Sequence, residues 1–280
     1  MKKILVTATA LAAFAAVGTA GAADLPPAPA YKAPMAAPVV VPSWTGCYVD
    51  GGIGYGMWNM DHYGEQPIPT AVTYTTTDGG RGWLGRGGIG CDWHVPNSSF
   101  VIGVFGDYDW MRLNGSSEPE LLVPTTGATA GIPATSPLSE TGAWYAGIRL
   151  GYLPYPNLMT YVDGGWTQTH FGQSNYVANT TGLGVGTIIT PLSTAAQTYS
   201  GWFIGGGTEY RVPWAGFNGL YWRTEYRFAQ YQSETLPFYV TATGVPLANG
   251  AGINTQPYVQ TVTTSLVWKF NWGGPVVAAY

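Results

Sequence analysis

The sequence predicts an all-β fold: an eight-stranded antiparallel up-and-down transmembrane β-barrel with long extracellular loops. Three observations predict it. The chain opens like an export signal, it contains few charged residues, and it consists of short alternating segments joined by links of alternating length. Together these features favour a protein that meets lipid along the outside of a closed sheet.

Residues 1–22 have the form of a signal peptide. Two lysines near the start precede an apolar stretch from Ile4 to Val17, and small residues lead to a cleavage point near Ala22/Ala23. An uncleaved membrane anchor is the alternative, but the stretch is shorter than the roughly 20 residues of a spanning helix. Because no later run reaches that length, the exported chain is expected either in the outer membrane as a barrel or soluble in the periplasm.

Composition separates these two destinations. Charged residues make up 9% of the chain, against roughly 25% in soluble domains, and there are 12 Trp and 19 Tyr. A soluble surface so poor in charge would aggregate, whereas a lipid-facing barrel needs few charges and many interfacial aromatic residues. The net charge of −4 argues against a nucleic-acid partner. The expected location is therefore the cell outer membrane, and the expected partners are its lipid and lipopolysaccharide.

Residues 23–43 are rich in Pro and Ala, and residues 44–280 are expected to form the barrel. The Pro-rich segment would be an extended periplasmic leader or a tail without a role. In the barrel region, period-2 alternation marks eight segments of 12–17 residues, long enough to cross a membrane as tilted strands. They are 44–60, 81–95, 99–113, 142–153, 158–170, 199–212, 219–231 and 258–271.

The links between these segments alternate in length, as periplasmic turns and extracellular loops do in an up-and-down barrel. The short links are 94–98, 154–157 and 213–218, and the long links are 61–80, 114–141, 171–198 and 232–257. Both ends of the barrel would then be periplasmic. β-Prone runs at 185–189 and 238–241 would allow strand extensions above the membrane.

Alternation also assigns the two faces of each strand. Outward aromatic residues fall in two bands, as expected at two membrane interfaces. The band near the long links contains Trp83, Trp110, Trp144, Trp166 and Trp202, and the band near the short links contains Trp93, Phe100, Tyr152, Tyr210, Trp222 and Trp268. Arg112 is the one strand charge on the outward parity, at a strand end where it can reach the interface.

The inward face carries seven acids and six bases, close to neutral, as a sealed interior requires because an unpaired buried charge is costly. They are Asp50, Arg86, Asp92, Asp107, Asp109, Arg149, Asp163, Glu209, Arg211, Arg223, Glu225, Arg227 and Lys269. A salt-bridge network in the lumen is the interpretation, preferred over acid/base catalysis by Glu209 and Glu225 because arginines share their layer.

Cys47 and Cys91 are expected nearly opposite each other on the first two strands, near the periplasmic end. In an oxidising compartment a cross-strand disulfide is compatible with this placement, and so are two free thiols. His62, His94 and His170 show no metal-ligand spacing. No catalytic, cofactor or metal site is expected, and the protein is not expected to be an enzyme.

Eight short motifs, spread over nearly the whole chain, resemble those of a known protein family. They are ADLPP (23–27), WTGCYVDGGIGYG (44–56), FGDYDW (105–110), WYAGIRLGY (144–152), YVDGGW (161–166), GWFIGGGTEY (201–210), RTEYRF (223–228) and SLVWKFNWGGPVVAAY (265–280). In their order and spacing they resemble the alphaproteobacterial outer-membrane immunogenic proteins, small barrels of the porin family and OmpA-like superfamily.

The resemblance implies an eight-stranded barrel with antigenic, surface-exposed loops. It also implies a terminal aromatic residue read by the barrel assembly machinery, either Phe270 or Tyr280. The two cysteines and the length of the loops depart from the family pattern.

Three functions follow in order of preference. The first is a structural, surface-exposed barrel with a closed lumen, contributing to envelope integrity and touching host or surface ligands through its loops. The second is a narrow porin for passive diffusion of small solutes, and the third is a soluble periplasmic β-protein or enzyme.

Overall fold

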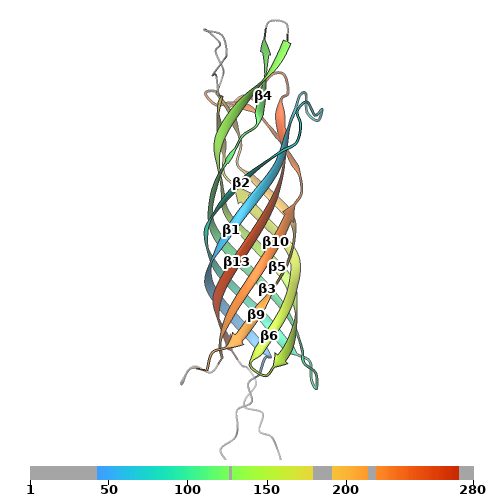
Figure 1. Cartoon of the computed structure of the whole chain (residues 1–280), viewed down its shortest axis with the longest axis vertical. Helices are drawn as coiled ribbons and strands as arrows, with labels where there is room; N and C mark the ends of the chain where they lie inside the picture. Colours follow the sequence, from blue (N-terminus) through green and yellow to red (C-terminus); the bar gives the residue numbers. More distant parts are fainter. Residues whose placement is uncertain (1–42, 126–127, 179–190, 214–218, 271–280) are drawn as a thin grey trace, which may run out of the picture. The chain divides into compact units, whose positions relative to one another are not determined.

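The described part of the chain forms an antiparallel β-sheet that closes on itself (Figure 1). The computed structural model describes residues 43–125, 128–178, 191–213 and 219–270. Their strands are β1 (Gly46–Glu65), β2 (Thr76–His94), β3 (Phe100–Ser117), β4 (Glu120–Thr125), β5 (Ala128–Tyr155), β6 (Leu158–Phe171), β7 (Ser174–Ala178), β8 (Leu192–Thr194), β9 (Gln197–Arg211), β10 (Leu220–Tyr231), β11 (Glu234–Pro237), β12 (Tyr239–Val240) and β13 (Gly252–Phe270). In these ranges, no helix has the length and apolar character needed to cross a membrane.

Eight of these strands make the ring. Each pairs antiparallel with the next in the order β1, β2, β3, β5, β6, β9, β10 and β13, and β13 closes the ring on β1. The predicted eight-stranded up-and-down barrel is thereby confirmed. Closure leaves no sheet edge whose backbone groups lack partners, which is what allows strands to face lipid.

The long links between ring strands are confirmed, but several ring strands extend further into these links than the alternation predicts. β1 continues to Glu65 and pairs with β13 as far as Gly252, and β2 begins at Thr76. The strands β4, β7, β8, β11 and β12 also lie inside predicted loops. Strands extend in this way because a neighbouring strand that continues beyond the membrane presents unpaired backbone N–H and C=O groups. Segments containing Thr and Tyr can pair with those groups even though they lack an apolar outer face.

Some predictions fall outside the described residues. These are the signal peptide, all of the leader except residue 43, the run at 185–189, residues 214–218 of the third short link and Tyr280. Of the second β-prone run, Tyr239–Val240 forms β12 and pairs with β8.

The barrel has two distinct ends, which we call the short-turn end and the hairpin end. At the short-turn end, residues 95–99 join β2 to β3, and Asn97 adopts a positive φ of 58°, a conformation that asparagine tolerates. Two residues join β5 to β6 at the same end. At the hairpin end, β4 and β5 pair from Glu120 to Pro133 and continue beyond the ring (Figure 1).

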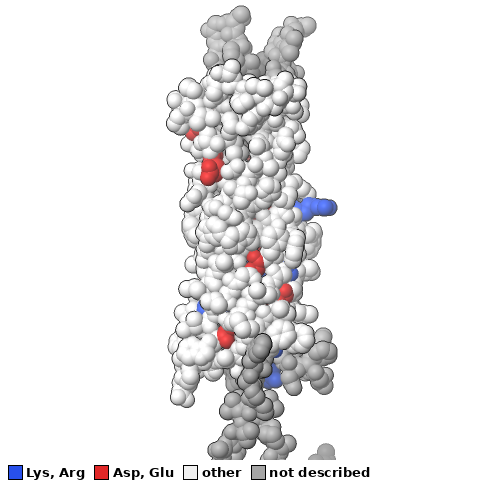
Figure 2. All heavy atoms as spheres, turned by 180° about the vertical axis from the view of Figure 1, so that it is seen from behind, with Lys and Arg blue, Asp and Glu red and all other residues white. Residues whose placement is uncertain are grey.

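The outer face is apolar and the interior is polar and aromatic. Trp83 and Trp110 are 69% and 60% exposed, and Figure 2 shows a surface on which few charged atoms appear. Inside, Tyr48, Phe105 and Tyr145 are buried beside the inward charges. The parity predicted from the sequence is therefore the one the strands adopt.

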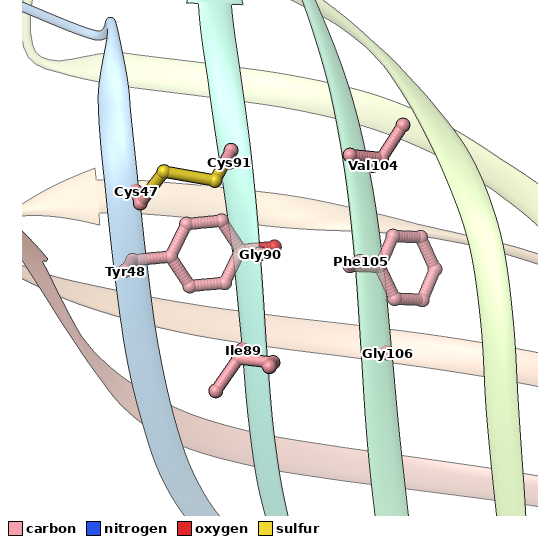
Figure 3. A pocket seen from close by; sticks show the side chains of 8 residues that line it. All are labelled: Cys47, Tyr48, Ile89, Gly90, Cys91, Val104, Phe105 and Gly106. Carbon is pink, nitrogen blue, oxygen red and sulfur yellow. A yellow bond between two sulfur atoms is a disulfide. The ribbon is translucent and has the colours of Figure 1, made fainter.

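Inward-facing glycines make room for the large side chains of the lumen. At Gly90 a Cβ atom would lie 2.8 Å from the Val104 carbonyl oxygen and would overlap the ring of Tyr48, which extends toward this position in Figure 3. At Gly85, on the outward face of the same strand, a Cβ atom would meet nothing within 4 Å. The absence of a side chain is therefore required at Gly90 by packing and not by backbone conformation.

Replacing Gly90 by alanine should lower the free energy of unfolding by about 1–3 kcal/mol, because the added methyl group must displace Tyr48 or the Val104 carbonyl. Urea unfolding of protein folded into lipid vesicles measures the change. Gly85→Ala is the matched control and should change stability by about 0.5 kcal/mol or less. Equal losses for the two variants would contradict the packing account.

Candidate functional site: the charged lumen

The structure brings the predicted inward charges together inside the barrel. Twelve of them are buried: Asp50, Arg86, Asp92, Asp107, Asp109, Arg149, Asp163, Glu209, Arg223, Glu225, Arg227 and Lys269. Arg211, the thirteenth, is half-exposed and forms no ion pair with a described residue. Arg211 differs from the other twelve because β9 ends at this residue, at the mouth of the barrel, where water can solvate the guanidinium.

The charges nearer the short-turn end form the Glu209 cluster, which consists of Asp50, Asp92, Arg149, Glu209, Arg223 and Lys269. Glu209 is its centre, since Arg223 lies 3.0 Å, Lys269 2.8 Å and Arg149 3.3 Å from its carboxylate oxygens. Lys269 also contacts Asp92 at 2.7 Å, and Arg223 contacts Asp50 at 3.0 Å. Three bases face three acids, so this cluster is formally neutral.

The charges further toward the hairpin end form the Glu225 cluster, which consists of Arg86, Asp107, Asp109, Asp163, Glu225 and Arg227. Arg86 binds Asp109 through two parallel hydrogen bonds of 2.6 and 2.8 Å and donates a third, of 2.7 Å, to Glu225. Arg227 contacts Asp107 and Glu225. Two bases face four acids here, so this cluster carries an excess of acid.

Aromatic rings fill the space around the cations. The Arg149 guanidinium lies 4.6 Å from the centre of the Tyr161 ring and 5.3 Å from that of Tyr48, and Arg227 lies 5.0 Å from Phe105. Tyr161 also donates a 2.7 Å hydrogen bond to Glu225. Cation–π contacts of this kind favour a desolvated guanidinium. The lumen is thus packed with alternating charged and aromatic groups.

Trp44 covers the interior at the short-turn end. Its side chain is 2% exposed, its Nε1 donates to the carbonyl oxygen of Pro156 at 3.1 Å, and its ring lies 4.9 Å from that of Tyr221. Lys269 Nζ sits 4.8 Å from the ring centre. The alternation places Trp44 only at the start of the first predicted strand, because no sequence pattern shows that a residue before a strand turns in under the barrel.

An apolar cluster lies at the hairpin end, within the predicted long links. Ala134, Tyr176, Leu192, Phe238 and Ile253 pack together there, from strands well separated along the chain. Burial raises the pKa of the Tyr176 phenol, which lies in β7 outside the ring. A cavity of only about 20 Å³, bordered by Tyr176, lies among the side chains at this end. It has room for about one water molecule.

Cys47 and Cys91 form a disulfide between β1 and β2 (Figure 3). The two residues are directly opposite in the strand register, with Cα atoms 3.9 Å apart. Ile89 and Val104 flank the bond in an apolar hollow of about 370 Å³ on the outer face. The disulfide therefore lies on the lipid side and takes no part in the lumen.

The histidines are dispersed, and each is engaged locally. His62 is hydrogen-bonded to Thr76 at 2.8 Å, and His94 contacts the carbonyl oxygen of Ser98 at 2.8 Å. Within the described ranges, no group of three His, Cys, Asp or Glu side chains could hold a metal ion.

Comparison with known proteins gives a relative in sequence. No family model matches the chain. It is 28% identical over 190 residues to the 31 kDa outer-membrane immunogenic protein of Brucella melitensis and to that of Brucella suis, covering 65% of this chain and 70% of each relative. The predicted resemblance is confirmed, and the outer membrane is the location of the protein.

Solved structures include similar chains at low identity. The outer membrane protein OprG of Pseudomonas aeruginosa is 10% identical with a TM-score of 0.42, covering 83% of this chain and all of that one. Ail, the attachment invasion locus protein of Yersinia pestis, is 8% identical with a TM-score of 0.28, covering 78% of this chain and 99% of that one.

Replacing Arg86 by methionine should destabilise the protein by about 3–5 kcal/mol, because Asp109 would remain buried without its partner and Glu225 would keep only Arg227. Adding Asp109→Asn should recover part of the loss, since the charge left without a partner is then removed. Chemical unfolding in lipid vesicles measures both variants. Arg211→Met is the control and should change little, and a comparable loss for Arg86→Met and Arg211→Met would contradict the pairing.

Proposed function

We propose that this outer-membrane β-barrel is a closed, structural protein of the cell envelope. Its proposed role is to support envelope integrity and to present the hairpin end as an antigenic or adhesive surface. The observation that supports closure is the pairing of buried charges across the lumen, with Glu209 bound by three cations. A pore that conducts water would expose such charges, whereas Arg149 and Glu209 are 1% and 0% exposed.

The same pairing argues against an enzyme. Glu209 and Glu225 each bind more than one base, so neither carboxylate is free to exchange a proton with a substrate. No cofactor is part of the proposal.

The partners proposed for the barrel are lipid and lipopolysaccharide along its wall, host or surface ligands at the hairpin end, and the assembly machinery. Phe270 ends β13, packs 4.9 Å from the Trp268 ring and is 38% exposed on the outer face. An exposed aromatic residue at the end of the last described strand is what an assembly signal would require.

A narrow pore for small solutes is the second candidate. The acid excess of the Glu225 cluster favours it, because an acidic constriction attracts cations. The guanidinium groups of Arg86 and Arg227 occupy that cluster, however, which favours the closed barrel.

Planar bilayers in potassium chloride should distinguish the two candidates. Purified protein is expected to give no stable single-channel steps, because side chains fill an eight-stranded interior. A general porin inserted in the same bilayers is the positive control. Stable, large steps, or liposome swelling in small sugars, would rule out the closed lumen.

Surface display can be tested with an epitope inserted between Thr125 and Ala128, in the hairpin of β4 and β5. Antibody should label intact cells that carry this insertion, because the hairpin end is proposed to face outward. The matched control is the same epitope at Asn97, in a turn of the short-turn end, which should be labelled only after the cells are opened. Labelling of the Asn97 variant on intact cells would contradict the orientation.

A further inference from the structure

The cations of the barrel are divided unequally between its interior and its surface. Among the described residues five are buried in the lumen: Arg86, Arg149, Arg223, Arg227 and Lys269. Arg81, Arg112 and Arg211 reach the surface instead. Arg211 lies at the short-turn end, but Arg81 and Arg112 lie together on the outer wall.

Arg81 and Arg112 are neighbours on adjacent strands. In the pairing of β2 with β3, Arg81 is opposite Asn114 and Trp83 is opposite Arg112. The two arginines are therefore diagonal neighbours on the same face, with a separation of about 7 Å. Both side chains are exposed. The expectation that Arg112 is the one strand charge on the outward parity is therefore wrong, because Arg81 shares that face in β2.

Two tryptophans fix the level of this pair along the barrel. Arg81 lies two residues beyond Trp83, and Arg112 lies two residues beyond Trp110, in both cases toward the hairpin end. The two tryptophans belong to the aromatic band at one membrane interface and are well exposed. The arginines consequently lie where lipid headgroups begin.

Nothing in the described protein neutralises this pair. Neither arginine belongs to an ion pair between described residues. Those ion pairs are His62–Asp78 and the pairs within the two lumen clusters. Asp61, on the adjoining strand, accepts a 2.5 Å hydrogen bond from Thr77, and Asp78 accepts one from the backbone of Glu118. Two positive charges without an ion-pair partner among the described residues are thus adjacent on the outer wall.

We propose that Arg81 and Arg112 bind a phosphate group of lipopolysaccharide in the outer leaflet, with Trp83 and Trp110 packing against its lipid portion. A guanidinium donates parallel hydrogen bonds to phosphate oxygens, so two guanidinium groups can hold one phosphate between them. Headgroup phosphates lie at the level of the aromatic band. The site depends on the hairpin end facing outward but not on a closed lumen, so porin-like conductance would leave it untouched.

Native mass spectrometry of the detergent-purified full chain tests the site. The probes are lipopolysaccharide with phosphorylated lipid A, the same material after phosphatase treatment, and phosphatidylglycerol. Wild-type protein should retain the phosphorylated form roughly tenfold to thirtyfold better than the dephosphorylated form. The double variant R81A/R112A should lose this preference, R81K/R112K should keep part of it, and R211A, the matched control, should behave as wild type.

The comparison between lipids uses wild-type protein, so it remains valid even if a variant fails to fold. Heat-modifiable migration on gels shows whether each variant is folded. Equal retention of the phosphorylated and dephosphorylated forms would overturn the proposal. So would undiminished retention by folded R81A/R112A, or equal retention of phosphatidylglycerol, which would indicate a site for any lipid phosphate.

Discussion

The width of the interior is the constraint on which the rest of the structure depends. Eight strands close around a space that only side chains can fill, so a charge that points inward loses bulk water and must find a partner. The partners come from far along the chain, as when Arg86 bridges residues 23 and 139 positions away, Asp109 and Glu225. The same contacts that satisfy the charges therefore also tie distant strands into one ring.

The two faces of each ring strand meet opposite environments. Outside, apolar and aromatic side chains meet lipid, and the few exposed arginines lie at or beyond the aromatic bands. Inside, the space left by glycines such as Gly90 is taken by Tyr48 and its neighbours, which separate the cations and hold them in place. Beyond the ring, the ladder continues into the hairpins, where an apolar cluster packs around Tyr176 and Phe238.

The sequence predicts well what depends on local periodicity and poorly what depends on closure. Alternation assigns Arg149 and Glu209 to the lumen, and hairpin symmetry places Cys47 near Cys91. The partners of Arg86 could not be predicted, because they depend on the stagger between strands of the closed ring. Strand ends were missed for a related reason, since extension beyond the membrane depends on a neighbouring strand and leaves no apolar outward pattern.

A closed barrel requires a dry lumen whose guanidinium groups are paired. Nuclear magnetic resonance of arginine Nε–H groups in the bilayer-embedded protein tests it most directly, through their exchange with water. Arg86 and Arg223, whose Nε atoms donate to Asp109 and Glu209, should exchange far more slowly than Arg81, Arg112 and Arg211. Equally fast exchange of lumen and surface arginines would show a hydrated interior and would contradict the closed barrel.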